Sequence, residues 1–150
     1  FYFHSSTSLF MLLYHRKEVT IMEFFLREIE KSLDNELYFI ALQSALTLPD
    51  ICAALQSPNG ETTGSQYIQW YNTYAKETGQ CSISGDDCYR FRCSCLHQGS
   101  SQHPKSSYRR IMFVIPNTQT TLHKNVINDA LNIDVKIFCS SNTPEFDEMP

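Results

Sequence analysis

Apolar residues repeat at helical spacing through much of this sequence, and this feature most constrains how the chain can fold. In 22–33 they recur every three or four positions with Glu and Lys between them, a pattern typical of an amphipathic helix. The same spacing returns in 37–48 and again in 65–76, where Thr62 or Thr63 can cap the start of the helix. Because only short connections separate these stretches, the predicted helices are expected to pack antiparallel against one another.

Pro49 lies inside the second apolar region. Proline has no N–H and its ring clashes with the preceding turn, so we expect Pro49 to kink or restart the helix. Thr47 and Asp50 have the spacing of a capping box, which predicts a new helix over 50–56. The turn residues of 57–60 then end this hairpin.

Aromatic residues form a stripe in the third helical stretch. They follow the i, i+3, i+4, i+7 pattern and are Tyr67, Trp70, Tyr71 and Tyr74. Such a stripe can stack on RNA bases. At helical spacing it more often belongs to a core or a subunit interface, and we expect it there.

A shorter helix is predicted over 84–99 from signals at both ends. Ser84 can cap its start, with Asp87 as the acidic partner of a capping box. Asp86 and Asp87 also complement the positive end of the helix dipole. Gly99 is a plausible stop.

The last part of the chain changes to strand patterns. The stretch 110–116 is apolar and rich in β-formers, which predicts a buried strand. The stretch 132–138 alternates apolar and polar residues, which predicts a half-buried strand. Between the two strands, a helical turn is expected within 122–131. The sequence therefore predicts a mainly α protein: an antiparallel bundle of four or five helices with a small two-stranded C-terminal β element.

The two ends of the sequence differ from its middle. An apolar run of six residues, 9–14, is too short to cross a bilayer, and positive charge follows it instead of preceding it as in a signal peptide. We expect a natural start at Met22, which makes 1–21 a leader or non-native segment, 22–139 one domain and 140–150 a polar tail. No other stretch is expected to span a membrane, and a cytoplasmic location is expected.

Six cysteines raise the question of a metal site. A zinc site would draw on residues that lack the paired spacing of common structural sites: Cys81, Cys88, Cys93, Cys95, His97 and His103. Reduced thiols in a cytoplasmic protein are the simpler expectation, with Cys88 and Cys95 packing as small hydrophobic residues. We therefore predict no metal and no cofactor.

Arg90, Arg92 and His97 all lie on the helix predicted over 84–99. Arginine offers a planar fork of donors matched to phosphate oxygens, and histidine transfers protons near neutral pH. Arg90 and His97 are seven positions apart and share one side of a helix, whereas Arg92 and His97 lie roughly 140° apart around the axis. A solvated helix face with a histidine near its end is the ordinary alternative.

The run Arg92-Cys93-Ser94-Cys95-Leu96-His97 resembles the R-x(4–6)-H signature of HEPN domains, and Arg90 to His97 fits it as well. The chain over 22–139 is also similar to a group of uncharacterised bacterial proteins. Many HEPN nucleases carry Asn, Asp or His directly after the arginine, whereas this chain has Cys93 and Phe91 there.

The resemblance implies a small helical bundle that dimerises and cleaves RNA without a metal, as in toxin–antitoxin and anti-phage defence systems. His97 would relay the proton during attack by a 2′-hydroxyl, and Arg92, assisted by Arg90, would neutralise charge on the phosphate. Two copies of this helix would face each other across a dimer axis. RNA, a second copy of the chain and an antitoxin are the implied partners.

Charge is distributed unevenly along the chain. The formal net charge is −4, yet 88–128 holds no Asp or Glu and six Lys and Arg. A basic segment of this kind is suited to phosphate recognition if folding keeps it on one face. Its candidates for substrate contact are Lys105, Arg109, Arg110 and His103.

Two non-catalytic hypotheses stand beside the nuclease. In the first, the same basic groove binds RNA or a protein without cutting it. In the second, Arg90 and Arg92 pair with Asp86 or Asp87 only to stabilise the helix. A Ser-His-Asp hydrolase and a nucleoside triphosphatase are disfavoured, because neither a nucleophile elbow nor a Gly-rich phosphate loop is present.

Overall fold

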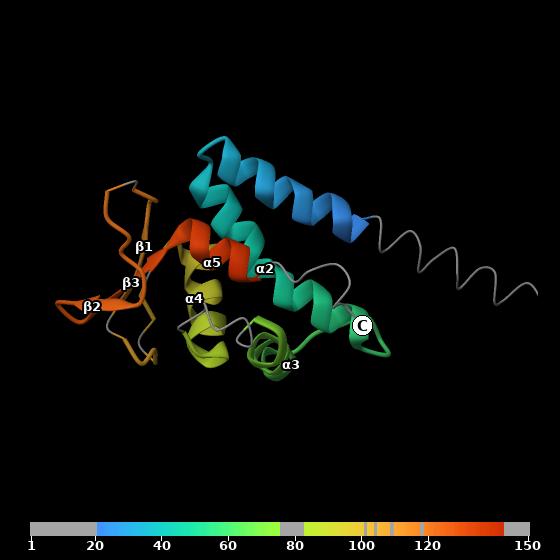
Figure 1. The fold of residues 1–150 in the computed structure, drawn as a ribbon. Coiled ribbons are helices and arrows are strands. Elements are labelled where there is room, and N and C mark those ends of the chain that lie inside the picture. The colour runs from blue at the N-terminus through green and yellow to red at the C-terminus, as the bar shows by residue number, and fades with distance from the viewer. Residues whose placement is uncertain are drawn as a thin grey trace, which may run out of the picture.

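A computed structural model describes residues 21–75, 83–100, 102–103, 105–108, 110–117 and 119–142. The predicted leader up to residue 20 and the predicted tail from residue 143 lie outside this description. Within it the protein is mainly helical, with a small three-stranded mixed sheet at one end (Figure 1).

The first described helix covers 21–34 and presents one apolar stripe to the core, as its periodicity predicts. The stripe consists of Met22, Leu26, Ile29 and Leu33, all of them buried. The helix ends where Glu36 adopts a left-handed conformation with φ of 59°. The Leu37 N–H then donates to the Ser32 carbonyl oxygen at 2.8 Å, which satisfies a helix-end acceptor and turns the chain into the next helix.

Helix α2 runs unbroken from Tyr38 to Gln56 with Pro49 inside it. The prediction that Pro49 restarts the helix, with a separate helix over 50–56, is therefore wrong. Proline removes one hydrogen bond of the helix, but Pro49 is fully buried, and α2 packs against α3, α4 and α5. These tertiary contacts outweigh the local preference, since most helix stability in proteins comes from packing.

The aromatic stripe lies on α3, Gly64–Trp70, and on a π-helical turn η1, Tyr71–Ala75. Thr63 caps α3 through a capping box with Gln66, as one of the two predicted caps. Tyr67, Trp70 and Tyr71 are buried, which confirms the core interpretation of the stripe. The change from α to π geometry at Tyr71 was not expected from the sequence.

Helix α4, Gly85–Gln98, confirms the prediction over 84–99 at both ends. The Ser84 side chain accepts a hydrogen bond from the Asp87 N–H at 3.1 Å. Gly99 ends the helix with φ of 59°, the left-handed conformation that glycine adopts without steric cost. Cys88 and Cys95 are buried, as predicted.

The C-terminal β element has three strands, not two. They are β1, Arg110–Val114; β2, Asn125–Ile127; and β3, Ala130–Asp134. The central strand β3 pairs parallel to β1 and antiparallel to β2. The helical turn expected within 122–131 is wrong, because Asn128 and Asp129 both have positive φ and join β2 to β3 as a hairpin.

Helix α5, Val135–Asn142, occupies the second half of the strand predicted over 132–138. The change occurs at Asp134, whose side-chain Oδ1 accepts a hydrogen bond from the Ile137 N–H at 3.0 Å and so caps a helix. Strand β3 is buried on both faces instead of alternating. The polar residues Ser141 and Asn142 are buried at the end of α5, where their side chains donate to the Phe138 carbonyl oxygen.

Three of the described helices pack against α2. They are α3, α4 and α5, and α3 contacts α4. In Figure 1 the sheet lies beyond α4 and α5, at the side of the molecule away from α3. One continuous apolar core runs from the first helix to Phe138 and Cys139 of α5.

Helix α2 also meets the length and composition criterion for a membrane span, the single helix to do so in the described part of the chain. No stretch of this kind was expected, because none was judged apolar enough from the sequence. A core helix of a water-soluble protein passes the same test. Helix α2 contacts α3, α4 and α5, and 44% of this apolar window is buried in the described structure.

Asp87 connects the loop after α4 to the start of that helix through hydrogen bonds. Its carboxylate is buried and accepts hydrogen bonds from the Ser106 hydroxyl at 2.9 Å and the Ser107 N–H at 2.7 Å. The Ser84 hydroxyl donates to its other oxygen at 3.0 Å. Burial raises the pKa of Asp87, but these hydrogen bonds to the charged form outweigh it and lower the pKa below its ordinary value.

Asp87→Asn is expected to lower the free energy of unfolding by roughly 2 kcal/mol at pH 7, because an amide group cannot accept all these hydrogen bonds. Since the folded state lowers the pKa, the carboxylate stabilises the protein above its unfolded pKa and loses this effect as pH falls through the folded value. The difference between the two proteins should therefore shrink below about pH 4. Urea unfolding at a series of pH values measures it. The exposed Asp34→Asn is the control, and a pH-independent difference would contradict the prediction.

Candidate functional site

Arg92 of α4 forms an ion pair with Asp50 of α2. Its Nη2 lies 2.7 Å from the Asp50 Oδ2, and the two side chains are 22% and 18% exposed. The pair therefore joins two helices at a partly buried position. Asp50 was predicted as a helix cap and was not among the candidate site residues.

A cluster of polar groups surrounds this ion pair. The Tyr67 hydroxyl, fully buried, donates to the Leu46 carbonyl oxygen at 3.0 Å and lies 3.4 Å from the Cys88 sulfur. Burial, followed by the neighbouring Cys88, raises the pKa of Tyr67 well above its ordinary value. Tyr67 is therefore a neutral hydrogen-bond donor that joins α3 to α2.

Burial affects the two partners of the ion pair differently. It raises the pKa of Asp50, and the attraction of Arg92 only partly offsets this effect. For Arg92, burial is the largest single effect and lowers the pKa, but the charge of Asp50 and the hydrogen bonds to Cys93 and Asp50 together outweigh it, so the pKa is raised. The ion pair is attractive, yet placing the Asp50 carboxylate there costs free energy of desolvation.

Arg90 and His97 lie on the other side of α4, where His97 is exposed and the Arg90 side chain is 27% exposed. The Arg90 Nη2 lies 2.7 Å from the Asp86 Oδ2 in a pair four residues apart, so one of the pairings proposed for a structural helix is present. His97 is exposed in the last turn. The helix repeat places Arg90 and His97 on the same side, two turns apart, while Arg92 faces Asp50.

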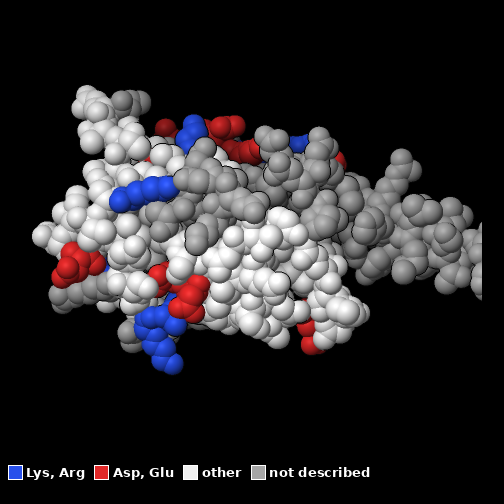
Figure 2. Space-filling model, turned by 60° about the horizontal axis from the view of Figure 1, so that its bottom comes forward, with Lys and Arg blue, Asp and Glu red and all other residues white. Residues whose placement is uncertain are grey.

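The predicted substrate-binding residues that the structure describes lie in the loop after α4 and at the start of β1. Lys105 is exposed in the loop after α4, and its N–H donates to the His103 Nδ1 at 3.2 Å. Arg110 is exposed at the start of β1. Arg109 lies outside the described residues. Figure 2 shows one face on which the coloured Lys and Arg groups lie apart, separated by uncharged surface or beside acidic groups.

The cysteines of the described ranges are free thiols. Burial raises the pKa of Cys52 to about 12, and burial followed by the charge of Asp134 raises that of Cys139 to about 12. These thiols are therefore unreactive at neutral pH. No group of three metal-ligating side chains comes together in the described part of the chain, from which Cys81 is missing.

Described residues line pockets near either end of α2. An apolar pocket of about 290 Å³ lies between the start of α2, the end of α4 and strand β1. Phe39, Phe91 and Met112 are among its lining residues. The second pocket, of about 280 Å³, lies between the end of α2 and α3. His97 lines neither of them.

Asp50 is the residue of this site that sequence reasoning missed. The signal available was a charged residue within a strongly apolar helical region, beside Pro49. A charge in such a place needs a partner. The partner itself lies far along the chain, and nothing in the local pattern of α2 identifies it.

A comparison with protein-family models, with curated proteins and with solved structures finds no match for this chain.

Arg92→Met is expected to destabilise the protein by roughly 2–3 kcal/mol at pH 7, since it leaves the Asp50 carboxylate partly buried without its partner. The raised pKa of Asp50 gives the sign of the pH effect. A carboxyl group with a raised folded pKa is most favourable when protonated, and stability falls as pH rises through that pKa. The cost of Arg92→Met should therefore shrink as pH is lowered.

A double-mutant cycle with Asp50→Asn checks this prediction by chemical denaturation. The double variant should recover part of the stability lost in Arg92→Met, because no unpaired carboxylate remains. Arg90→Met is the matched control, because its pair with the half-exposed Asp86 lies at the surface. Additive effects of the two substitutions would show that the ion pair does not couple α2 and α4.

Proposed function

We propose that this chain is a helical domain of HEPN type that cleaves RNA without a metal ion, as a toxin or anti-phage defence component. In this proposal the helices form an antiparallel bundle, and two copies of the chain place their α4 helices across a shared RNA cleft. The cleavage reaction is attack of a 2′-hydroxyl on the adjacent phosphate, which leaves a 2′,3′-cyclic phosphate.

The observation that supports this proposal is the accessible face of α4. His97 is exposed there, and Arg90 lies on the same side in a surface pair with Asp86. A surface ion pair of this kind contributes little free energy, so a phosphate can replace Asp86 as the partner of Arg90. The face therefore offers a histidine that can transfer a proton and an arginine that can bind a phosphate in place of Asp86.

Each residue then has a defined role. His97 accepts the proton of the attacking 2′-hydroxyl or donates one to the leaving oxygen. Arg90 neutralises charge that builds on the phosphate. Arg92 and Asp50 hold α4 against α2, and Lys105 and Arg110 contact the RNA backbone beyond the cleaved bond.

A second candidate is a helical module that binds RNA or a protein without cutting it. The specific observation in its favour is that both arginines already pair with carboxylates at 2.7 Å. Paired guanidinium groups provide less positive potential for a phosphate than free ones. Binding without cleavage distinguishes this candidate from the first.

His97→Ala is expected to lower the rate of RNA cleavage by about 10²–10⁴-fold, the usual contribution of a general acid or base. The assay incubates labelled RNA with the purified full chain in EDTA and identifies the 2′,3′-cyclic phosphate end. His123→Ala is the control, because His123 lies at the sheet, where its Nδ1 accepts a hydrogen bond from the Asp134 N–H. Thermal melting confirms that each variant folds.

The same assay separates the two arginines. Arg90→Ala should reduce cleavage with little change in stability, whereas Arg92→Ala should lower stability as well. Retention of intact RNA by a protein that produces no cyclic phosphate would establish the binding module instead. Cleavage that is unchanged in His97→Ala would exclude the proposed chemistry.

A further inference from the structure

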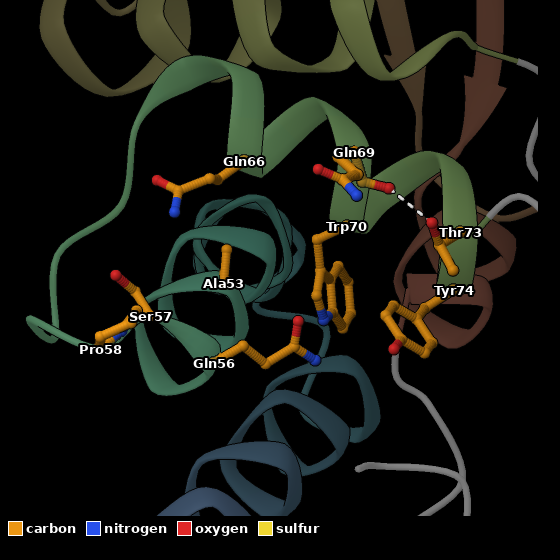
Figure 3. Close-up of a pocket in the computed structure, with 9 residues that line it drawn as sticks. All are labelled: Ala53, Gln56, Ser57, Pro58, Gln66, Gln69, Trp70, Thr73 and Tyr74. Atoms are coloured by element: carbon orange, nitrogen blue, oxygen red, sulfur yellow. Dashed lines mark hydrogen bonds between the residues drawn. The ribbon is translucent and has the colours of Figure 1, made fainter.

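The pocket between the end of α2 and α3 is lined by uncharged side chains. Its volume is about 280 Å³. Figure 3 shows its side chains converging from α2, the following turn, α3 and η1. The lining residues are Ala53, Gln56, Ser57, Pro58, Gln66, Gln69, Trp70, Thr73 and Tyr74. No Lys, Arg, Asp or Glu is among these described side chains.

Three glutamine amides provide most of the hydrogen-bonding groups. The Gln66 Oε1 is already used, because it accepts from the Thr63 N–H and hydroxyl at 2.8 Å, which leaves its NH₂ group as a donor. Gln56 and Gln69 are exposed and offer an acceptor and a donor each. The Thr73 hydroxyl donates to the Gln69 carbonyl oxygen at 2.8 Å, so its oxygen remains an acceptor.

Aromatic rings form one side of the pocket. The Trp70 and Tyr74 rings lie 5.2 Å apart between centroids with an interplanar angle of 37°. Trp70 is the last residue of α3, and Tyr74 lies in the π-helical turn Tyr71–Ala75 that follows it. Such turns are uncommon and occur frequently at functional sites.

From these observations we infer that the pocket binds an uncharged nucleobase. A charged ligand would find no opposite charge among the described lining residues. A glutamine amide matches the paired donor and acceptor on the edge of a base, and the partly exposed Tyr74 ring, backed by the buried Trp70, packs against its flat face. The volume admits one ring system and not an oligomer.

This inference does not depend on RNA cleavage by α4. The pocket is lined by the end of α2, the turn after it, α3 and η1, and none of its lining residues belongs to α4. A chain that cleaves no RNA can still bind a base there, and a nuclease can lack this site. The two proposals therefore succeed or fail separately.

Trp70 is the single tryptophan of the chain, so its fluorescence reports on this pocket alone. The experiment titrates the full chain with adenosine, guanosine, cytidine and uridine, with ribose and glucose as comparison ligands. At least one nucleoside should change the Trp70 emission saturably, with a dissociation constant of roughly 0.1–1 mM as expected for a small ligand. Ribose and glucose should leave the emission unchanged.

Gln69→Glu keeps the shape of the side chain but replaces its donor by a negative charge. It should weaken nucleoside binding by roughly tenfold or more. Gln102→Glu makes the same chemical change at an exposed position outside the pocket and should bind as the original chain does. The inference is overturned by any of three results: no response to the four nucleosides, an equal response to the sugars, or unaltered binding in Gln69→Glu.

Discussion

The Asp50–Arg92 ion pair joins α2 to α4, two helices that pack against each other. Asp50 is the single charged residue of α2 and lies next to the buried Pro49. A carboxylate in such surroundings is unfavourable unless a cation lies nearby. The raised pKa of Asp50 shows that Arg92 offsets only part of this cost. The net contribution of the pair to stability is therefore small, although removal of Arg92 alone leaves a carboxylate without its partner.

The helix ends were predictable because their signals are local. Ser84, Thr63 and Gly99 act through hydrogen bonds and backbone angles within a few residues, and each has the predicted role. Pro49 shows the limit of this reasoning, because the buried surface of α2 keeps the helix continuous despite the lost hydrogen bond. A pattern within one segment contains no information on how much surface other segments will bury.

The C-terminal errors have a different origin, since local signals were present there and were overlooked. Alternating residues predict a strand over 132–138, but Asp134 is a helix cap and ends β3. Asn128 and Asp129 are residues that tolerate positive φ and join a hairpin. For the site, the helix repeat correctly separated Arg92 from Arg90 and His97. The partner of Arg92 could not be identified, because no local rule connects positions so far apart in the chain.

The two sides of α4 have different roles: one packs against α2, and the other carries the candidate functional residues. Arg92 faces α2, where its replacement disturbs packing, whereas Arg90 and His97 lie on a side that a partner can reach. Asp87 fixes the start of the helix and the following loop, so this side is presented in a defined orientation. Arginines that are close in sequence thus have different energetic roles. Loss of function after substitution of Arg92 alone would therefore not identify a catalytic group, whereas loss after substitution of Arg90 or His97 in a stably folded chain would.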